Sequence, residues 1–189
     1  MTNGGRLITL VGQSGSGKTT QMRELVEAGF RQSPNITTRP QRPATDLPDE
    51  YRYVNDEEYG RLLAQGELLW DVITGNGARY SKERSEVEQV LATRHNTSVN
   101  ALVPDKAAEL VRRYGAEVIK TVWLPSPDDD VLIERMTRRG DSVQGATERI
   151  ARERLEDWTA QALAIEGLYV VTGITVPDRH REIIDFAMS

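Results

Sequence analysis

The chain has 189 residues, including 24 Lys or Arg, 29 Asp or Glu and no Cys, and its formal net charge is −5. This length allows one well-buried core rather than two full domains, so we expect a single domain over residues 1–189. Because neither sign of charge forms a long run, we expect no nucleic-acid partner. The lack of cysteine excludes a disulfide framework and a cysteine nucleophile. The apolar runs are only strand-length and the N-terminus has no signal-peptide core, so we expect no membrane association and a cytoplasmic location by default.

Residues 7–20 combine a strand, a glycine-rich turn and the start of a helix. The apolar run over residues 7–11 is typical of a strand buried on both faces of a parallel sheet. The turn has the pattern Gly12-x-x-x-x-Gly17-Lys18-Thr19, whose backbone N–H groups can surround a phosphate at the positive end of the helix. Lys18 would bind the β- and γ-phosphates, and Thr19 would bind a phosphate-bound Mg²⁺. The predicted nucleotide site comprises Gly12, Ser14, Gly15, Ser16, Gly17, Lys18, Thr19 and Thr20.

Helical and strand patterns alternate along the rest of the chain. The expected helices cover residues 18–28, 55–66, 82–94, 104–115, 127–138, 146–166 and 178–187. The expected strands cover residues 68–73, 98–103, 118–124 and 168–172. Ser81 and Ser126 are predicted to cap the helices that follow them, and residues 75–77 to form a turn. Residues 31–53 contain four prolines, so they are interpreted as a binding insertion or a loose loop. This alternation predicts an α/β fold with a doubly wound, mostly parallel sheet.

The irregular segment contains Asn35-Ile36-Thr37-Thr38-Arg39-Pro40-Gln41-Arg42-Pro43, with Tyr51 nine residues after Arg42. Two guanidinium groups and a phenol hydroxyl can neutralise and orient a dianionic phosphate, although a solvated basic loop has a similar composition. The segment resembles the acceptor-binding stretch of guanylate kinases, in which Thr-Thr-Arg-x-x-Arg and a later Asp-Tyr or Glu-Tyr bind the phosphate of GMP. The resemblance gives this role to Asn35, Thr38, Arg39, Arg42 and Tyr51.

Residues 75–81 resemble the Gly-Asn-x-Tyr-Gly-Thr segment of the same family with one residue of drift, which makes Tyr80 a further phosphate ligand. In guanylate kinases a glutamate just before the tryptophan of the preceding strand reads guanine, but Leu69 precedes Trp70 here. Asp71 could take over this acceptor role, because a carboxylate can pair with the N1–H and amine of guanine. It could equally be a solvated residue at the end of a strand.

Asn100 lies in a predicted strand where guanylate kinases have an Asp-x-Asp pair. An amide can bind a base, a ribose or a metal-bound water, but it adds no negative charge toward Mg²⁺, so the metal would depend on Thr19 and the phosphates. This stretch also resembles ribose 1,5-bisphosphate phosphokinases, which phosphorylate a sugar phosphate. Asn100 is therefore a candidate acceptor-binding residue in both interpretations.

Residues 135–149 carry Arg135 and Arg139 four apart on a predicted helix, with Arg149 further on. The segment resembles the guanylate kinase lid, Arg-x-x-x-Arg-Gly-x-Asp-Ser with a later arginine, which closes over the donor and neutralises the transferring phosphoryl group. Nearby acidic residues also allow a surface helix with ion pairs. With Lys18, the resemblance makes Arg135, Arg139 and Arg149 the candidate catalytic residues.

The resemblance covers residues 7 to about 184 and implies a P-loop nucleoside monophosphate kinase fold. Its core would be residues 5–31, 96–134 and 151–189, its acceptor-binding region residues 32–95 and its lid residues 135–150. The implied reaction is Mg²⁺-dependent phosphoryl transfer from ATP to a nucleoside monophosphate, with GMP or dGMP as first choice. The alternatives are a kinase of ribose 1,5-bisphosphate or of an unusual nucleotide, and a non-catalytic guanylate-kinase-like binding module. The expected partner is a small-molecule phosphoacceptor, and a homo-oligomer stays open.

Overall fold

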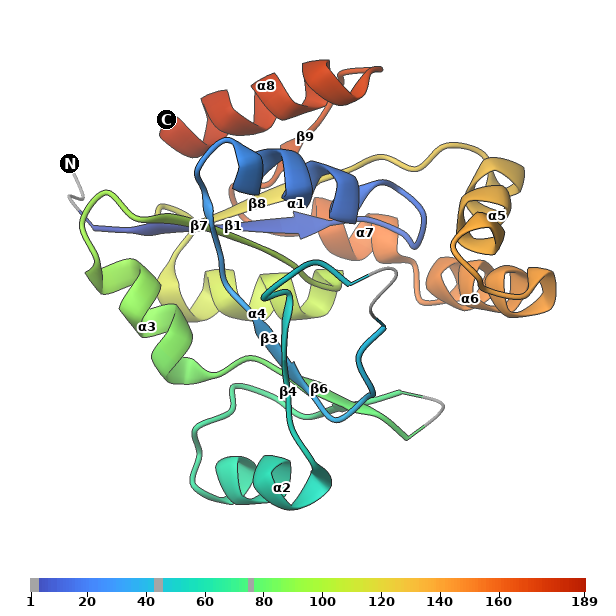
Figure 1. Ribbon diagram of the computed structural model, residues 1–189. Helices are drawn as coiled ribbons and strands as arrows, with labels where there is room; N and C mark the ends of the chain where they lie inside the picture. Colours follow the sequence, from blue (N-terminus) through green and yellow to red (C-terminus); the bar gives the residue numbers. More distant parts are fainter. Residues whose placement is uncertain (1–3, 43–45, 75–76) are drawn as a thin grey trace. The chain divides into compact units, whose positions relative to one another are not determined.

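The computed structural model describes residues 4–42, 46–74 and 77–189, drawn as a ribbon in Figure 1. The chain divides into two compact units, which are described separately. The first unit contains the described residues of 1–7 and 30–100, and the second contains residues 8–29 and 101–189. Pro43 and the Gly75-Asn76 part of the predicted turn lie outside the described residues.

A five-stranded sheet has the strand order β2-β7-β1-β8-β9. The strands are β2 (Arg31–Gln32), β7 (Thr97–Ala101), β1 (Arg6–Val11), β8 (Ile119–Trp123) and β9 (Tyr169–Val170). β2 pairs with β7 in parallel, and β8 pairs with β9 in parallel. Four of the five expected strands, those at 7–11, 98–103, 118–124 and 168–172, thus lie in this sheet, and the mostly parallel sheet is confirmed.

Helices cover both faces of β8 in the second unit. The helices of this unit are α1 (Lys18–Glu27), α4 (Pro104–Tyr114), α5 (Asp129–Arg138), α6 (Val143–Leu155), α7 (Trp158–Leu163) and α8 (Val176–Met188). α8 packs on β8 and α1, whereas α4 packs on β8 and α7, on opposite sides of the strand in Figure 1. This arrangement confirms the doubly wound α/β fold. No helix in the described ranges is long and apolar enough to cross a membrane.

Two predictions about the second unit were wrong. The single helix expected over residues 146–166 is two helices, because Asp157 adopts a left-handed φ of 49° and its carboxylate caps α7 through the N–H of Ala160 at 3.1 Å. Ser126 caps no helix, since α5 begins only at Asp129 after Asp128. The break after α6 changes the direction of the chain where a continuous helix was expected.

The first unit contains a smaller sheet with the order β4-β3-β6-β5. The strands of this sheet are β3 (Asn35–Thr37), β4 (Tyr51–Tyr53), β5 (Val72–Ile73) and β6 (Arg79–Ser81). The helices of the first unit are α2 (Asp56–Ala64) and α3 (Arg84–Ala92). β3 runs parallel to β4 and antiparallel to β6. Ile36, Tyr59, Leu62 and Leu68 form a buried cluster in this unit. Three short paired strands therefore lie in the segment expected to be irregular, whereas its described residues between β3 and β4 form no helix or strand.

Local signals succeeded for α2 and failed for α3. Asn55 caps α2 by accepting a hydrogen bond from the N–H of Glu58 at 2.8 Å, as expected. Ser81 was wrongly predicted to cap the next helix: it belongs to β6, and its hydroxyl donates to the carbonyl of Trp70. The helix begins instead at Arg84. The strand expected at 68–73 is confined to Val72–Ile73.

Candidate functional site

The glycine-rich turn of the second unit joins β1 to α1 and is called the phosphate loop here, residues 12–19. A Cβ at Gly12 would lie 2.7 Å from Ser16 Oγ and 2.8 Å from the carbonyl of Leu124, so only glycine allows this close approach. Gly17 precedes α1 with a φ of +106°, a left-handed conformation that a side chain would strain. These two glycines hold the turn against the N-terminus of α1, where anions bind favourably.

Lys18 and Ser16 fit a phosphate ligand. The ammonium of Lys18 donates to the carbonyls of Gly12 and Gln13 at 2.6 and 2.9 Å, so it lies against the loop. Ser16 is 1% exposed, and its hydroxyl has no hydrogen-bond partner among the described residues. Thr19, in the first turn of α1, is half-buried. An unsatisfied buried hydroxyl in this turn is the kind of group that a bound phosphate would satisfy.

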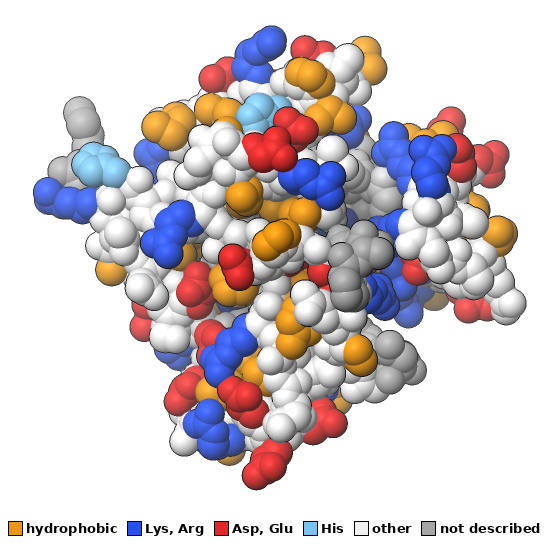
Figure 2. Space-filling view, in the orientation of Figure 1, with side chains coloured by type: hydrophobic (Ala, Val, Ile, Leu, Met, Phe, Trp, Pro, Cys, Tyr) orange, Lys and Arg blue, Asp and Glu red, His pale blue; other side chains and the backbone are white. Residues whose placement is uncertain are grey.

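The three arginines of the predicted lid differ in their contacts. Arg135 on α5 donates to the carbonyl of Gly15 at 3.0 Å, which brings it to the phosphate loop. Arg139 donates to Asp141 at 2.9 Å, and Arg149 on α6 pairs with none of the described residues. On the face shown in Figure 2, basic and acidic side chains are interspersed. Only Arg135 of the three thus contacts the loop directly.

Glu153 is a residue of this site that the sequence did not reveal. It lies on α6, is 2% exposed, and accepts hydrogen bonds from the N–H and hydroxyl of Ser14 at 2.9 and 2.6 Å. The buried residues of α6 are Ala146, Ile150 and Glu153, spaced four and three apart on one helix face. This spacing is the signal that could have identified Glu153 as an inward-facing acid.

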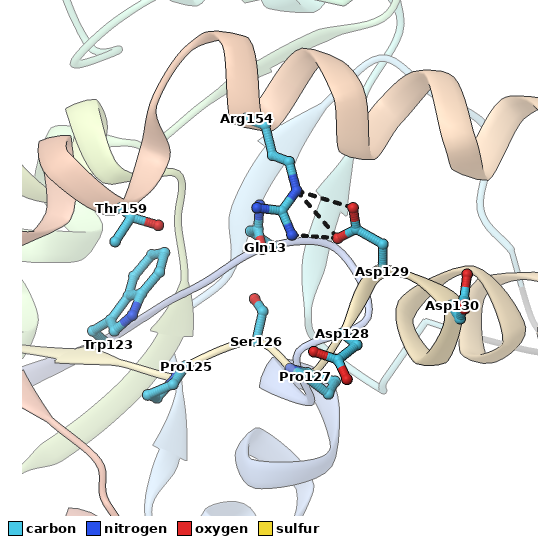
Figure 3. Close-up of a pocket in the computed structure, with 10 residues that line it drawn as sticks. All are labelled: Gln13, Trp123, Pro125, Ser126, Pro127, Asp128, Asp129, Asp130, Arg154 and Thr159. Atoms are coloured by element: carbon cyan, nitrogen blue, oxygen red, sulfur yellow. Dashed lines mark hydrogen bonds and ion pairs between the residues drawn. The ribbon is translucent and has the colours of Figure 1, made fainter.

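A cavity of about 540 Å³ lies beside the phosphate loop within the second unit. Figure 3 shows Gln13 of the loop on its wall, together with Trp123 from β8 and Thr159 from α7. Arg154 donates to Asp129 from above this space at 3.1 Å. No group of three or more His, Cys, Asp or Glu in the described part of the chain could hold a metal ion.

In the first unit, Arg39 is the centre of a polar cluster. It donates to the two carboxylate oxygens of Asp46 at 2.8 and 2.7 Å, and Asp46 also accepts from the hydroxyl of Tyr53 at 2.6 Å. Burial raises the pKa of Asp46, but the hydrogen bonds from Arg39, Tyr53 and the N–H of Arg42 outweigh it and hold the pKa below its usual value. The guanidinium therefore already binds an anionic group.

The other predicted acceptor residues lie around this cluster or beside it. The ring of Tyr51 lies 4.6 Å from the guanidinium carbon of Arg39, and Tyr80 packs edge-on against Tyr51 at 6.3 Å. The side chain of Arg42 is exposed and has no partner within the described ranges. Thr38 accepts from the N–H of Arg79 at 3.0 Å, and Asn35 is buried in β3.

Asp71 belongs to a different cluster of the first unit. Arg79 donates to both of its oxygens, with one distance of 3.1 Å, and Tyr59 donates to it at 3.1 Å. Hydrogen bonding from Arg79, and then from Tyr59, holds the pKa of Asp71 below its usual value against the effect of burial. The carboxylate is thus paired within the protein.

Asn100 and Lys82 are buried polar residues of the first unit. Asn100 lies near the carboxyl end of β7, is 1% exposed, and neither its amide nitrogen nor its oxygen has a partner among the described residues. Ligands of parallel sheets bind at the carboxyl ends of strands, so the Asn100 amide, which has no partner among the described residues, fits a ligand-binding role.

Lys82 was not identified from the sequence. Its ammonium donates to the carbonyl and hydroxyl of Ser33 and to the carbonyl of Pro34 at 2.6 to 2.8 Å.

No family model matches the chain, but curated proteins resemble it over most of their length. It is 31% identical over 172 residues to the guanylate kinase of Symbiobacterium thermophilum, covering 88% of this chain and 77% of that protein. It is 34% identical to the guanylate kinase of Streptomyces kasugaensis over 185 residues, covering 95% of this chain and 85% of that protein. Among solved structures, guanylate kinase from Anaplasma phagocytophilum has the same fold, with a TM-score of 0.68 and 19% identity over 98% of this chain and 86% of that one.

Proposed function

The chain belongs to the guanylate kinase family, and from this premise we propose that it transfers the γ-phosphoryl group of ATP to the phosphate of a nucleoside monophosphate, GMP or dGMP being the first choice. The observation that carries the proposal is the phosphate loop, in which Lys18 lies against the turn and the buried hydroxyl of Ser16 has no described partner. Both features fit the phosphates of a nucleotide.

The second unit would bind the donor. Lys18 would place its charge at the β- and γ-phosphates, and the N-terminus of α1 would stabilise their negative charge. Thr19 would hold Mg²⁺, which supplies charge neutralisation on the phosphates when bound. Arg135, which already contacts the loop at Gly15, would act on the transferring group together with Arg139 and Arg149 in a lid over residues 135–150.

The first unit would bind the acceptor. Arg39 and Arg42 would neutralise its phosphate, and the hydroxyls of Tyr51 and Tyr80 would fix the direction of that phosphate. Asn35, Thr38, Asp71 and Asn100 would complete the acceptor site. The acceptor phosphate is itself the nucleophile once its charge is screened and it is aligned with the γ-phosphorus, so no covalent enzyme intermediate is needed.

A sugar phosphate is the second candidate acceptor. The observation that favours it is Asn100, whose amide stands in place of a family acid and has no partner in the described part of the chain. An amide both donates and accepts hydrogen bonds, so it suits the hydroxyl groups of a ribose as well as a base.

The test is to incubate the purified protein with Mg²⁺ and ATP and with GMP, dGMP, AMP, CMP, UMP or ribose 1,5-bisphosphate, and to measure ADP. We expect GMP or dGMP to give the highest kcat/KM. Lys18→Met should abolish turnover without changing the circular dichroism spectrum. Lys106→Met, a control on α4, should leave turnover unchanged. Turnover of only the sugar bisphosphate would replace the acceptor, and ATP binding without ADP from any acceptor would favour a binding module.

A further inference from the structure

We propose that Glu153 is a positioning residue that anchors the phosphate loop through Ser14, an inference that rests on the proposed ATP-dependent function. The two carboxylate oxygens of Glu153 each accept one hydrogen bond from Ser14, at 2.9 Å from its N–H and at 2.6 Å from its hydroxyl. The two residues are 139 positions apart in the chain. A distant helix thus fixes both donors of one loop residue.

The position of Glu153 is fixed by the packing of α6. Ala146 and Ile150, on the same face of the helix, pack with Leu132 and Met136 of α5. Glu153 follows them toward the C-terminal end of α6, where it is 2% exposed. The carboxylate is therefore held by a packed helix pair and does not have to be ordered by the loop that it binds.

Burial makes these two hydrogen bonds necessary to Glu153. A buried carboxylate is costly unless it is paired or hydrogen-bonded, and Glu153 forms no ion pair within the described ranges. Ser14 supplies the two donors that compensate for burial. Ser14 was predicted as a nucleotide ligand, but in this structure its N–H and hydroxyl both donate to Glu153, so Ser14 anchors the loop.

A second contact joins the same helix pair to the next residue of the loop. Arg135 of α5 donates to the carbonyl of Gly15 at 3.0 Å, one residue after the contact of Glu153 with Ser14. α5 and α6 pack against each other. The two helices of the predicted lid region therefore hold consecutive residues of the phosphate loop, one through a donor and one through an acceptor.

Two substitutions separate hydrogen-bond geometry from charge. Glu153→Gln removes the charge, but its amide keeps the length of the side chain, accepts from the N–H of Ser14 and donates to its hydroxyl oxygen. Glu153→Asp keeps the charge but is one methylene shorter, so it withdraws from Ser14 by about 1.5 Å. If Glu153 positions the loop, the glutamine variant should bind ATP nearly as tightly as the wild type. The aspartate variant should bind ATP more weakly.

The experiment measures the dissociation constant of ATP with Mg²⁺ by calorimetry, with no acceptor present. We expect Glu153→Asp to weaken ATP binding about tenfold, the effect of losing one hydrogen bond to a charged group, and Glu153→Gln to change it less than about threefold. Glu156→Gln and Glu156→Asp are the matched controls, because Glu156 is exposed at the C-terminal end of the same helix and lies outside the predicted lid. They should leave ATP binding unchanged.

Ser14→Ala supplies an independent measurement if Glu153→Asp fails to fold. It removes only the hydroxyl bond, so it should weaken ATP binding about threefold, and by a similar factor in the Glu153→Gln background, because that glutamine keeps its bond to the hydroxyl. Steady-state kinetics should show the KM of ATP rising while the KM of the acceptor stays constant, which a general loss of stability would not produce.

A glutamine variant that loses as much ATP affinity as the aspartate variant, or an aspartate variant that loses none, would overturn the positioning role. A wild-type protein that binds no ATP would overturn this role and the proposed function together. A protein that binds ATP but phosphorylates no monophosphate would contradict only the proposed acceptor, and the Glu153 variants would still decide the role of Glu153.

Discussion

The guanidinium of Arg39 donates hydrogen bonds of 2.8 and 2.7 Å to the two oxygens of the Asp46 carboxylate, and each side chain is only 7% exposed. The paired oxygens of a carboxylate present to a guanidinium nearly the same geometry as two oxygens of a phosphate. The cluster around Arg39 is thus built for an anion. An acceptor phosphate that binds Arg39 has to share this group with Asp46 or replace Asp46.

The first prediction concerns the contribution of Asp46 to stability. Its pKa is lowered in the folded protein, whereas an unfolded Asp has a pKa of about 3.9. The stabilisation is therefore present above pH 4 and is lost as the pH falls through the lower, folded pKa. We expect Asp46→Asn to reduce the free energy of unfolding by about 1–3 kcal/mol at pH 7 and by less at pH 3, below the pKa of an unfolded Asp.

Urea denaturation of both proteins at the two pH values checks this prediction. Asp49→Asn is the control, since Asp49 is exposed and its φ of 60° suits asparagine as well as aspartate. A difference between wild type and Asp46→Asn that stays constant from pH 7 to pH 3 would show that the charge of Asp46 does not stabilise the cluster.

The second prediction concerns Arg42, whose exposed side chain has no partner among the described residues. Because Arg42 has no internal carboxylate to give up, it should contribute more net binding to the acceptor phosphate than Arg39 does. Arg42→Ala should raise the acceptor KM about ten- to hundredfold, the effect of one hydrogen bond to a charged group. The KM of ATP should change less than about twofold.

Steady-state kinetics with each substrate varied in turn checks this prediction. Arg61→Ala is the control, because Arg61 is exposed on α2 and its side chain donates, among the described residues, only to Gln65. An equal rise in both KM values would mean that Arg42 acts on the donor or on the fold.

The sequence predicted the fold best where the signals are local. The cap of α2 at Asn55 needs only the N–H of Glu58, three residues on. At Asp157 the same kind of local cap, to the N–H of Ala160 three residues on, was missed, because the left-handed φ of 49° that separates α6 from α7 is adopted by an aspartate and is not marked by a glycine. At Ser81, strand pairing with Ile36 of β3 and the bonds of its hydroxyl to the backbone of Trp70 outweighed a good local preference for a helix cap.

The same distinction holds for the candidate site. The phosphate loop is contiguous, so its residue types and spacing were enough to predict it. The contact of Glu153 with Ser14 joins positions 139 residues apart, and Lys82 binds oxygens 49 residues before it. Such contacts depend on how the chain folds back, which helical and strand periodicities do not specify.

The third prediction concerns base recognition by Asp71. A carboxylate can accept the N1–H and amine of guanine, whereas an amide turns a donor toward one of them and leaves it unpaired. We therefore expect Asp71→Asn to raise the KM of GMP about tenfold, a penalty of about 1–3 kcal/mol, and to leave the KM of ATP and any activity with AMP unchanged.

The control for this prediction is Asp56→Asn, an exposed acid at the start of α2. Asp71 also pairs with Arg79 and Tyr59, so the unfolding midpoint of each variant has to be measured as well. A lower midpoint with an unchanged GMP constant would make Asp71 a structural partner of Arg79 and would leave guanine recognition to other residues.

The last prediction concerns Lys82, which is fully buried and donates to three oxygens of Ser33 and Pro34. Burial lowers the pKa of Lys82 to about 7, although attraction from Glu86 and Glu83 opposes this effect. An unfolded lysine has a pKa of about 10.4. Between these two values the unfolded chain binds more protons than the folded chain, so the stability of the wild type should rise with pH in this interval.

Lys82→Met removes the titrating group, so the difference in unfolding free energy between wild type and variant isolates the effect of Lys82. We expect this difference to be constant below pH 6 and then to shift in favour of the wild type by up to about 1.4 kcal/mol per pH unit, or about 2 kcal/mol between pH 7 and pH 9. Urea denaturation from pH 5 to pH 9 measures it, with Lys106→Met as the control. A difference that does not change with pH, or that shifts in favour of the variant, would mean that the ammonium stays charged throughout and that Lys82 binds the neutral oxygens of Ser33 and Pro34 as a permanent cation.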